Sequence, residues 1–183
     1  SRGLGDVYKR QMEYTSYLDK TLKQILLKRI RQLNTPLEPK PTGVSERLSP
    51  LPDIRAVLFD VYGTLFVSGS SEISIANQIS NQQALTEALQ WAGFTGNLVT
   101  ASAKGVEWLL QTIQQTHATQ RQAGISYPEV DIRDEWKTVL EALQRAGLIA
   151  GEITPKTILR VSVEYEFRVN PVWPMPDALT VLQ

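Results

Sequence analysis

Apolar residues recur at intervals of three and four positions in several separate parts of the chain, which is the spacing of one helix face. Three such runs comprise Leu85, Ala88, Leu89 and Ala92; Val106, Leu109, Leu110 and Ile113; and Trp136, Val139, Leu140 and Leu143. Gly93, the segment 124–128 and Gly147 supply breaks between them. We therefore predict a helical region that occupies most of residues 71–170.

The segment 154–169 carries two patterns at once. Apolar Val161, Val163 and Tyr165 alternate with polar residues, as in a half-buried strand, whereas Val161, Tyr165 and Val169 also share a helical face. Thr154 followed by Pro155 is typical of a helix start, with the threonine as N-cap and proline in the first turn. We predict a helix here.

A separate amphipathic helix is predicted at residues 12–33. Its apolar stripe consists of Leu18, Leu22, Ile25, Leu26, Ile30 and Leu33, and its other face carries Lys20, Lys23, Lys28, Arg29 and Arg31. A basic amphipathic helix can lie on an anionic membrane surface. Because the stripe is aliphatic and lacks aromatic anchors, we expect it instead to dock on the protein that follows, with the lysines in solvent.

A proline-rich linker is predicted at residues 34–53, since prolines disrupt helices and central strands. Its prolines are Pro36, Pro39, Pro41, Pro50 and Pro52. The net charge changes from +3 over residues 12–52 to −5 over residues 53–183. Both observations place a domain boundary near Asp53.

A short, almost continuous apolar run, residues 54–59, ends at Asp60. Such a run is typical of a strand in a parallel sheet that is covered on both faces. Gly63 then allows the chain to turn sharply. Because ligands bind outside the carboxyl ends of strands in open α/β sheets, Asp60 is a candidate functional carboxylate. A residue that merely caps the turn would satisfy the same pattern.

The sequence from Asp60 to Leu65, Asp-Val-Tyr-Gly-Thr-Leu, resembles motif I of the haloacid dehalogenase (HAD) superfamily. Residues 171–183 resemble the segment by which members with a helical cap return to the core, although Asp177 stands where glycine is more usual. The resemblance implies an α/β fold, a HAD-like Rossmannoid core with an inserted α-helical cap. The chain would hold only the first core strand (within residues 54–70), the cap (71–170) and the return helix (171–183), and would be predominantly helical.

The resemblance also implies roles for residues. Asp60 would be the nucleophile that forms a covalent intermediate. Tyr62 occupies the acid/base position of motif I, where a phenol is a poor proton shuttle at neutral pH. Gly63 and Thr64 would bind the transferring group through N–H and hydroxyl donors. Mg²⁺ would be held by the Asp60 carboxylate and the Tyr62 backbone carbonyl.

Three functions remain open. A hydrolase of a phosphorylated small molecule is favoured. A 2-haloacid dehalogenase, which needs neither a leaving-group proton nor a metal, also carries tyrosine at this position, but no arginine for an anionic substrate occurs between Leu65 and Arg121. The third is a non-catalytic remnant or binding module. The family's later motifs, a Ser or Thr, a Lys and an acidic pair, are not in the sequence, so we expect a truncated piece that is inactive by itself and an active parent enzyme.

The first residues and the overall composition exclude several kinds of site and partner. Residues 1–11 resemble the translation of a transposase sequencing-library adapter, and we expect them to be an artefact. The absence of cysteine excludes disulfides and thiolate metal sites, and zero net charge gives no basic field for nucleic acid. No apolar run is long enough for a membrane span. We expect a cytoplasmic protein with a small-molecule substrate, in which Trp91, Trp108, Trp136 and His117 serve packing or the surface rather than ligand binding.

Overall fold

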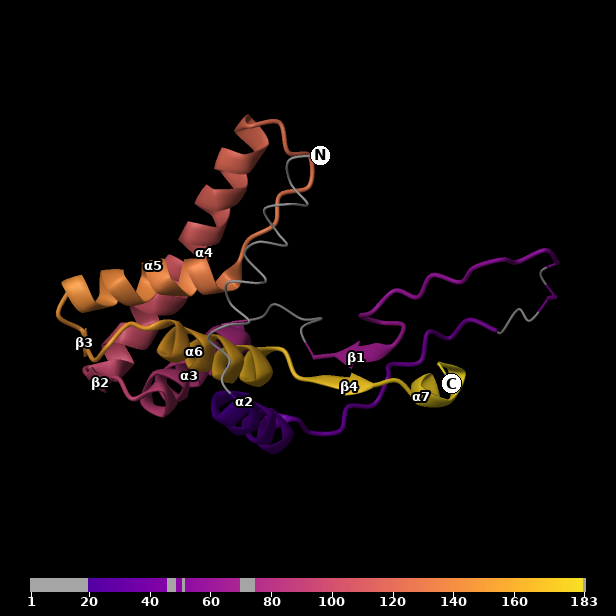
Figure 1. Cartoon of the computed structure of the whole chain (residues 1–183), viewed down its shortest axis with the longest axis horizontal. Coiled ribbons are helices and arrows are strands. Elements are labelled where there is room, and N and C mark those ends of the chain that lie inside the picture. The colour runs from indigo at the N-terminus through magenta and orange to yellow at the C-terminus, as the bar shows by residue number, and fades with distance from the viewer. Residues whose placement is uncertain (1–19, 46–48, 51, 70–74, 183) are drawn as a thin grey trace.

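The computed structural model describes residues 20–45, 49–50, 52–69 and 75–182. The predicted adapter, residues 1–11, and the first part of the predicted N-terminal helix lie outside the described residues. The helices are α2 (Lys20–Leu33), α3 (Ile75–Ala92), α4 (Leu98–Gln122), α5 (Ile132–Arg145), α6 (Pro155–Val169) and α7 (Ala178–Val181). The strands are β1 (Phe66–Ser68), β2 (Thr95–Gly96), β3 (Ile149–Ala150) and β4 (Val172–Pro174). The chain is predominantly helical, as predicted (Figure 1).

Helices α3 to α6 form one body around a common apolar core. Helix α3 packs against both α6 and α4, and α5 packs against α4 and α6. The core includes the fully buried side chains of Leu85, Leu89, Leu140 and Leu143. At Gly105 in α4, an added Cβ would lie 2.7 Å from Leu85 Cδ2, so α3 and α4 approach each other closely there. The predicted apolar faces therefore meet in the core, except at Leu110, which is 57% exposed.

Glycines end three of these helices where the sequence predicted breaks. Gly93, Gly124 and Gly147 have φ values of +94°, +86° and +68°, which glycine adopts without a steric penalty. The loops that follow α3 and α5 meet as the antiparallel pair β2–β3, with Thr95 opposite Ala150. This pairing fixes one end of the helical body.

Helix α6 confirms the helical interpretation of the ambiguous segment. Thr154 Oγ1 accepts a hydrogen bond from Thr157 N (3.2 Å), and Thr157 Oγ1 accepts one from Thr154 N (2.8 Å), so the two threonines form a capping box. The alternating pattern was misleading because α6 is contacted by α2, α3 and α5. With neighbours on several sides, even its polar residues Ser162 and Glu164 are buried.

Replacing Thr154 by alanine is expected to lower the free energy of unfolding by about 1 kcal/mol, because the cap satisfies a helix N–H that would otherwise lack a partner. Urea denaturation followed by circular dichroism measures the loss. Thr119→Ala, at an exposed position inside α4, is the matched control and should change stability much less. Equal losses in the two variants would contradict the capping role.

The helical body lies in the sequence between two strands that pair with each other. β1 and β4 are antiparallel, with Phe66 opposite Pro174 and Ser68 opposite Val172. The Ser68 hydroxyl donates to Asn170 Oδ1 at 2.7 Å, which extends the contact to the end of α6. The two-stranded ribbon brings the chain before β1 and the chain after β4 to the same end of the molecule (Figure 1).

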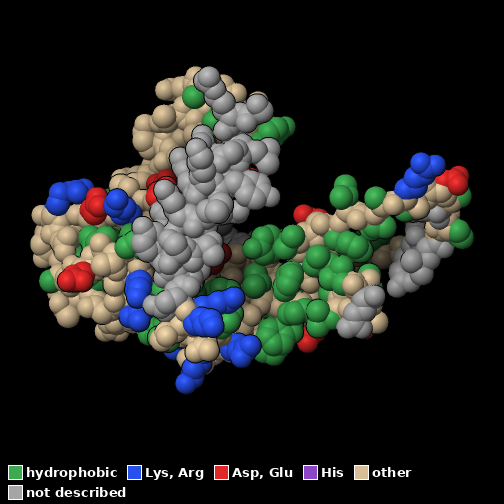
Figure 2. Space-filling model, in the orientation of Figure 1, with side chains coloured by type: hydrophobic (Ala, Val, Ile, Leu, Met, Phe, Trp, Pro, Cys, Tyr) green, Lys and Arg blue, Asp and Glu red, His purple; other side chains and the backbone are tan. Residues whose placement is uncertain are grey.

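The predicted parallel strand at residues 54–59 is not formed. The segment pairs with no other strand, and its side chains are exposed, with Leu58 97% and Val57 64% accessible. In Figure 1 the proline-rich linker runs out from the helical body and residues 54–59 run back toward β1, and apolar side chains gather on the surface there (Figure 2). A strand needs neighbours for its backbone N–H and C=O groups. In the described part of the chain the strands form only two antiparallel pairs.

Helix α2 docks on α6, as predicted for the N-terminal helix. Leu22 and Leu26 are buried in the contact, whereas Lys20, Lys23 and Lys28 are exposed. The described linker residues after it form no helix or strand, as expected from the prolines. No helix among the described residues has the length and apolarity that a membrane crossing requires.

Candidate functional site

Asp60 is an exposed residue at the end of the apolar extended segment, immediately before a tight turn. Val61 O accepts hydrogen bonds from Leu65 N and Phe66 N, both at 2.9 Å, and Gly63 N donates to Phe66 O at 2.8 Å. Gly63 has φ +83°, so the turn uses the conformational freedom that the sequence predicted for it. The turn leaves the Asp60 side chain accessible from solvent.

The other predicted site residues share this turn. Tyr62, Gly63 and Thr64 are all exposed. The return segment lies beside them, because Met175 N donates to Leu65 O at 2.9 Å. The structure therefore collects the predicted site residues at one exposed end of the β1–β4 ribbon.

A magnesium ion would find few protein ligands at this turn. Mg²⁺ requires near-octahedral oxygen coordination, with protein carboxylates supplying one or two ligands and waters several. Asp60 and the Tyr62 carbonyl offer two oxygens, and the described residues contain no group of three or more His, Cys, Asp or Glu side chains that could hold a metal. The turn thus offers two of the oxygen ligands that Mg²⁺ would need, and water or further groups would have to supply the others.

A buried charged cluster, which the sequence did not predict, lies between α2, α3 and α6. The side chain of Glu164 is 0% exposed. Arg29 Nε and Nη2 donate to its two carboxylate oxygens, each at 2.6 Å, and Arg168 Nε donates to Oε1 at 2.8 Å. Arg168 Nη1 also pairs with Glu87 Oε2 at 2.5 Å. We call these four residues the α2 clamp, because they join α2 to the helical body.

The α2 clamp holds Glu164 in its ionised form. Burial raises the pKa of Glu164, but the hydrogen bonds and charges of Arg29 and Arg168 lower it more, so the pKa lies below its usual range. The Glu164 hydrogen bond in turn raises the pKa of Arg29. Arg29, on the basic face of α2, is therefore paired inside the protein, whereas the lysines of that face are exposed. The available signal was on α6, where Glu164 stands three residues after Val161 and therefore on the buried face.

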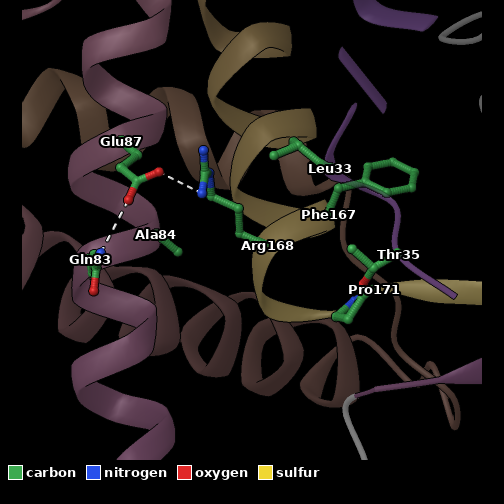
Figure 3. Close-up of a pocket in the computed structure, with 8 residues that line it drawn as sticks. All are labelled: Leu33, Thr35, Gln83, Ala84, Glu87, Phe167, Arg168 and Pro171. Atoms are coloured by element: carbon green, nitrogen blue, oxygen red, sulfur yellow. Dashed lines mark hydrogen bonds and ion pairs between the residues drawn. The ribbon is translucent and has the colours of Figure 1, made fainter. Parts of the chain in front are cut away.

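A cavity of about 330 Å³ adjoins the α2 clamp (Figure 3). It is lined by Leu33, Thr35, Gln83, Ala84, Glu87, Phe167, Arg168 and Pro171. Arg168 points toward Glu87, and Gln83 Nε2 donates to the same carboxylate at 3.3 Å (Figure 3). Arg168 is the one cation among the lining residues and is paired with two carboxylates, so the cavity has no spare positive charge for an anionic ligand.

The aromatic residues serve packing, as predicted. Trp136 is buried and makes an edge contact with Tyr165, with ring centroids 4.9 Å apart. The guanidinium carbons of Arg29 and Arg160 lie 5.6 and 5.7 Å from the centroid of the Trp91 ring. Stacked arginines stabilise such rings by cation–π attraction. Trp108 and His117 are partly buried on α4.

Comparisons with known proteins add nothing to this geometry. No protein-family model, no curated protein and no solved structure matches the chain. A functional assignment therefore depends on the residues themselves, chiefly residues 60–65 and the return segment 171–183.

Proposed function

We propose that Asp60 is the nucleophile of a HAD-like hydrolase that acts on a phosphorylated small molecule. The observation that carries the proposal is the position of Asp60, which ends an apolar extended segment and precedes a tight turn closed at Gly63. A carboxylate that is accessible at the end of such a segment can approach a phosphorus atom without displacing protein atoms.

In the proposed reaction an Asp60 oxygen attacks phosphorus and forms an acyl-phosphate as the substrate oxygen departs with the bonding electron pair. Water then cleaves the acyl-phosphate, which releases phosphate and restores the carboxylate. The Thr64 hydroxyl and the Gly63 backbone N–H would donate hydrogen bonds to the phosphoryl oxygens. The Gly63 amide is already donating to Phe66 O at 2.8 Å, so the Thr64 hydroxyl is the better placed of the two donors.

The position of the β1–β4 ribbon is a second observation that supports the proposal. It attaches the helical body to the chain only a few residues after Asp60, and Met175 N bonds to Leu65 O beside the turn. A helical body attached in this way would cover a substrate held at Asp60. We propose Mg²⁺ as the cofactor, with the Asp60 carboxylate and the Tyr62 carbonyl as two of its ligands and water or further protein groups as the others.

A 2-haloacid dehalogenase is the second candidate, and Tyr62 is the observation that favours it. The residue replaces the carboxylic acid that would protonate a leaving oxygen, and a halide leaves without a proton. The non-catalytic alternative is a binding module that uses the exposed apolar segment 54–59. The first candidate should release phosphate, the second should release halide, and the binding module should release neither.

The deciding experiment compares an aryl phosphate with Mg²⁺ and 2-haloacids without metal as substrates. We expect no Asp60-dependent turnover from the 183 residues alone, because the Ser or Thr, the Lys and the acidic pair that would surround the nucleophile in the proposed enzyme are not among them. A longer reading frame that carries the downstream motifs should release phosphate, and Asp60→Asn should lower its kcat by at least about a thousandfold.

Asp53→Asn is the matched control, since Asp53 is also exposed and lies outside the turn. It should leave kcat unchanged. Release of halide alone would reverse the order of the two enzyme candidates, and undiminished turnover by Asp60→Asn would overturn both of them.

A further inference from the structure

The side of α2 that is turned away from α6 is strongly basic. It carries four exposed cations and one exposed apolar residue, which together we call the outward face: Lys20, Lys23, Leu27, Lys28 and Arg31. Helix α2 contains no acidic residue. In the described part of the chain none of the four cations pairs with a carboxylate. Figure 2 shows Lys and Arg side chains gathered over α2.

The α2 clamp leaves the outward face available to a partner. Glu164, the carboxylate that α2 meets on α6, is buried and already receives hydrogen bonds from Arg29 and Arg168. Leu22 and Leu26 are buried in the contact with α6. The apolar stripe of the helix is therefore used inside the protein. A partner can meet the outward face while α2 stays docked.

The shape and charge of the outward face suit a flat anionic surface. Helix α2 has 14 residues and is therefore about 21 Å long, with its cations distributed along that length. A helix with its side chains is about 10–12 Å across. The part of the helical body behind α2 would thus lie farther from such a surface than the Debye length of about 8 Å at physiological salt. The acidic charge carried there is then largely screened, and the cations of α2 decide the attraction.

Leu27 distinguishes between kinds of anionic partner. The side chain is 42% exposed and stands four residues after Lys23 and four before Arg31, so the three lie together on the helix surface. The phosphate backbone of a nucleic acid offers no apolar surface to a leucine. At a phospholipid interface, by contrast, the leucine enters the boundary of the acyl chains while the cations stay among the headgroups. Burial of its apolar surface then adds affinity.

We propose that the outward face of α2 binds the surface of a membrane that contains anionic phospholipids. The four cations lie against the negative headgroups, Leu27 enters the boundary of the acyl chains, and α6 holds the helix parallel to the membrane plane. The contact is peripheral and involves no spanning segment. It does not use Asp60, so the proposal holds whichever reaction the protein performs.

Sedimentation of the 183-residue chain with lipid vesicles tests the proposal. Vesicles of phosphatidylcholine with about one-third phosphatidylserine should bind the protein, and pure phosphatidylcholine vesicles should not. Each Lys or Arg near an anionic membrane contributes roughly fivefold in affinity. The triple variant Lys20→Gln/Lys23→Gln/Lys28→Gln should therefore weaken binding at least about thirtyfold.

The matched control replaces three exposed cations of α4 and α5 and should leave vesicle binding unchanged: Lys104→Gln/Arg121→Gln/Lys137→Gln. Both triple variants keep the basic residues of the segment 1–11, so a difference between them belongs to α2. Circular dichroism checks that each variant retains its helices. Equal binding by the two triple variants, or equal binding of the protein to the two kinds of vesicle, would overturn the proposal.

Other polyanions test the class of partner. Leu27→Gln keeps every charge and should weaken vesicle binding severalfold, because it removes the apolar contact. A short DNA duplex and polyglutamate supply negative charge without an acyl layer, and both should bind more weakly than the phosphatidylserine vesicles. Tighter binding of either polymer, or undiminished vesicle binding by Leu27→Gln, would overturn the assignment to lipid and indicate a nucleic acid or an acidic protein.

Discussion

Replacing Glu164 by alanine is expected to destabilise the protein by about 3 kcal/mol, because the substitution leaves two arginines facing a buried space without their carboxylate. Arg29 and Arg168 are 25% and 24% exposed, so each can recover some hydration, which keeps the loss at the lower end of the range for buried pairs. Urea denaturation at pH 7, followed by circular dichroism, measures the change in the free energy of unfolding.

Glu166→Ala is the matched control for this prediction, since Glu166 is on the same helix and exposed. This substitution should change the free energy of unfolding by no more than a few tenths of a kcal/mol, as expected at the surface. A Glu164→Ala variant no less stable than Glu166→Ala would show that the α2 clamp contributes nothing to folding.

The stabilisation by Glu164 should also depend on pH in a definite direction. The pKa of Glu164 is lower in the folded protein than its usual value, since the hydrogen bonds of Arg29 and Arg168 outweigh burial. A carboxyl group whose pKa is lowered on folding stabilises the folded protein at pH values above its unfolded-state pKa of about 4.3. That stabilisation is lost as the pH falls through the folded-state pKa. The difference in stability between the wild-type protein and Glu164→Ala should therefore shrink between pH 5 and pH 3, as parallel urea titrations can measure.

Replacing Trp136 by alanine is expected to cost about 3–5 kcal/mol, the range for deletion of a large buried aromatic side chain. Trp136 is 1% exposed, and its edge contact with Tyr165 has an interplanar angle of 71°, a favourable aromatic geometry. Thermal and urea denaturation measure the loss.

Trp108→Ala removes the same side chain from a partly exposed position on α4 and should cost clearly less. If the two alanine variants were equally stable, the buried position of Trp136 in the core would be contradicted.

Local patterns in the sequence were sufficient to predict most of the helices. Apolar spacing identified the faces of α3, α4 and α5, and glycine marked their ends, because both signals depend on residues within a few positions of one another. Thr154 and Pro155 decided the ambiguous segment for the same reason. A capping box is complete within four residues, so no distant part of the chain is needed to form it.

Interactions between distant residues were the ones that the sequence did not predict. Arg29 and Glu164 are 135 positions apart, and neither residue's neighbours reveal the other. The predicted strand at residues 54–59 failed because a strand depends on partners elsewhere, and an apolar run alone does not supply them. At the candidate site, the local turn at Gly63 was predictable, whereas the contact between Leu65 and Met175 required the β1–β4 pairing.

The α2 clamp and the β1–β4 ribbon attach the chain to the helical body at both ends of the segment 34–65. That segment is consequently a tether whose two ends are held by the same helical body. A protease that cut within the proline-rich part would leave two polypeptides still associated through α2 and α6. A shortened protein that began at Asp53, where composition places the boundary, would lose part of its own folding unit.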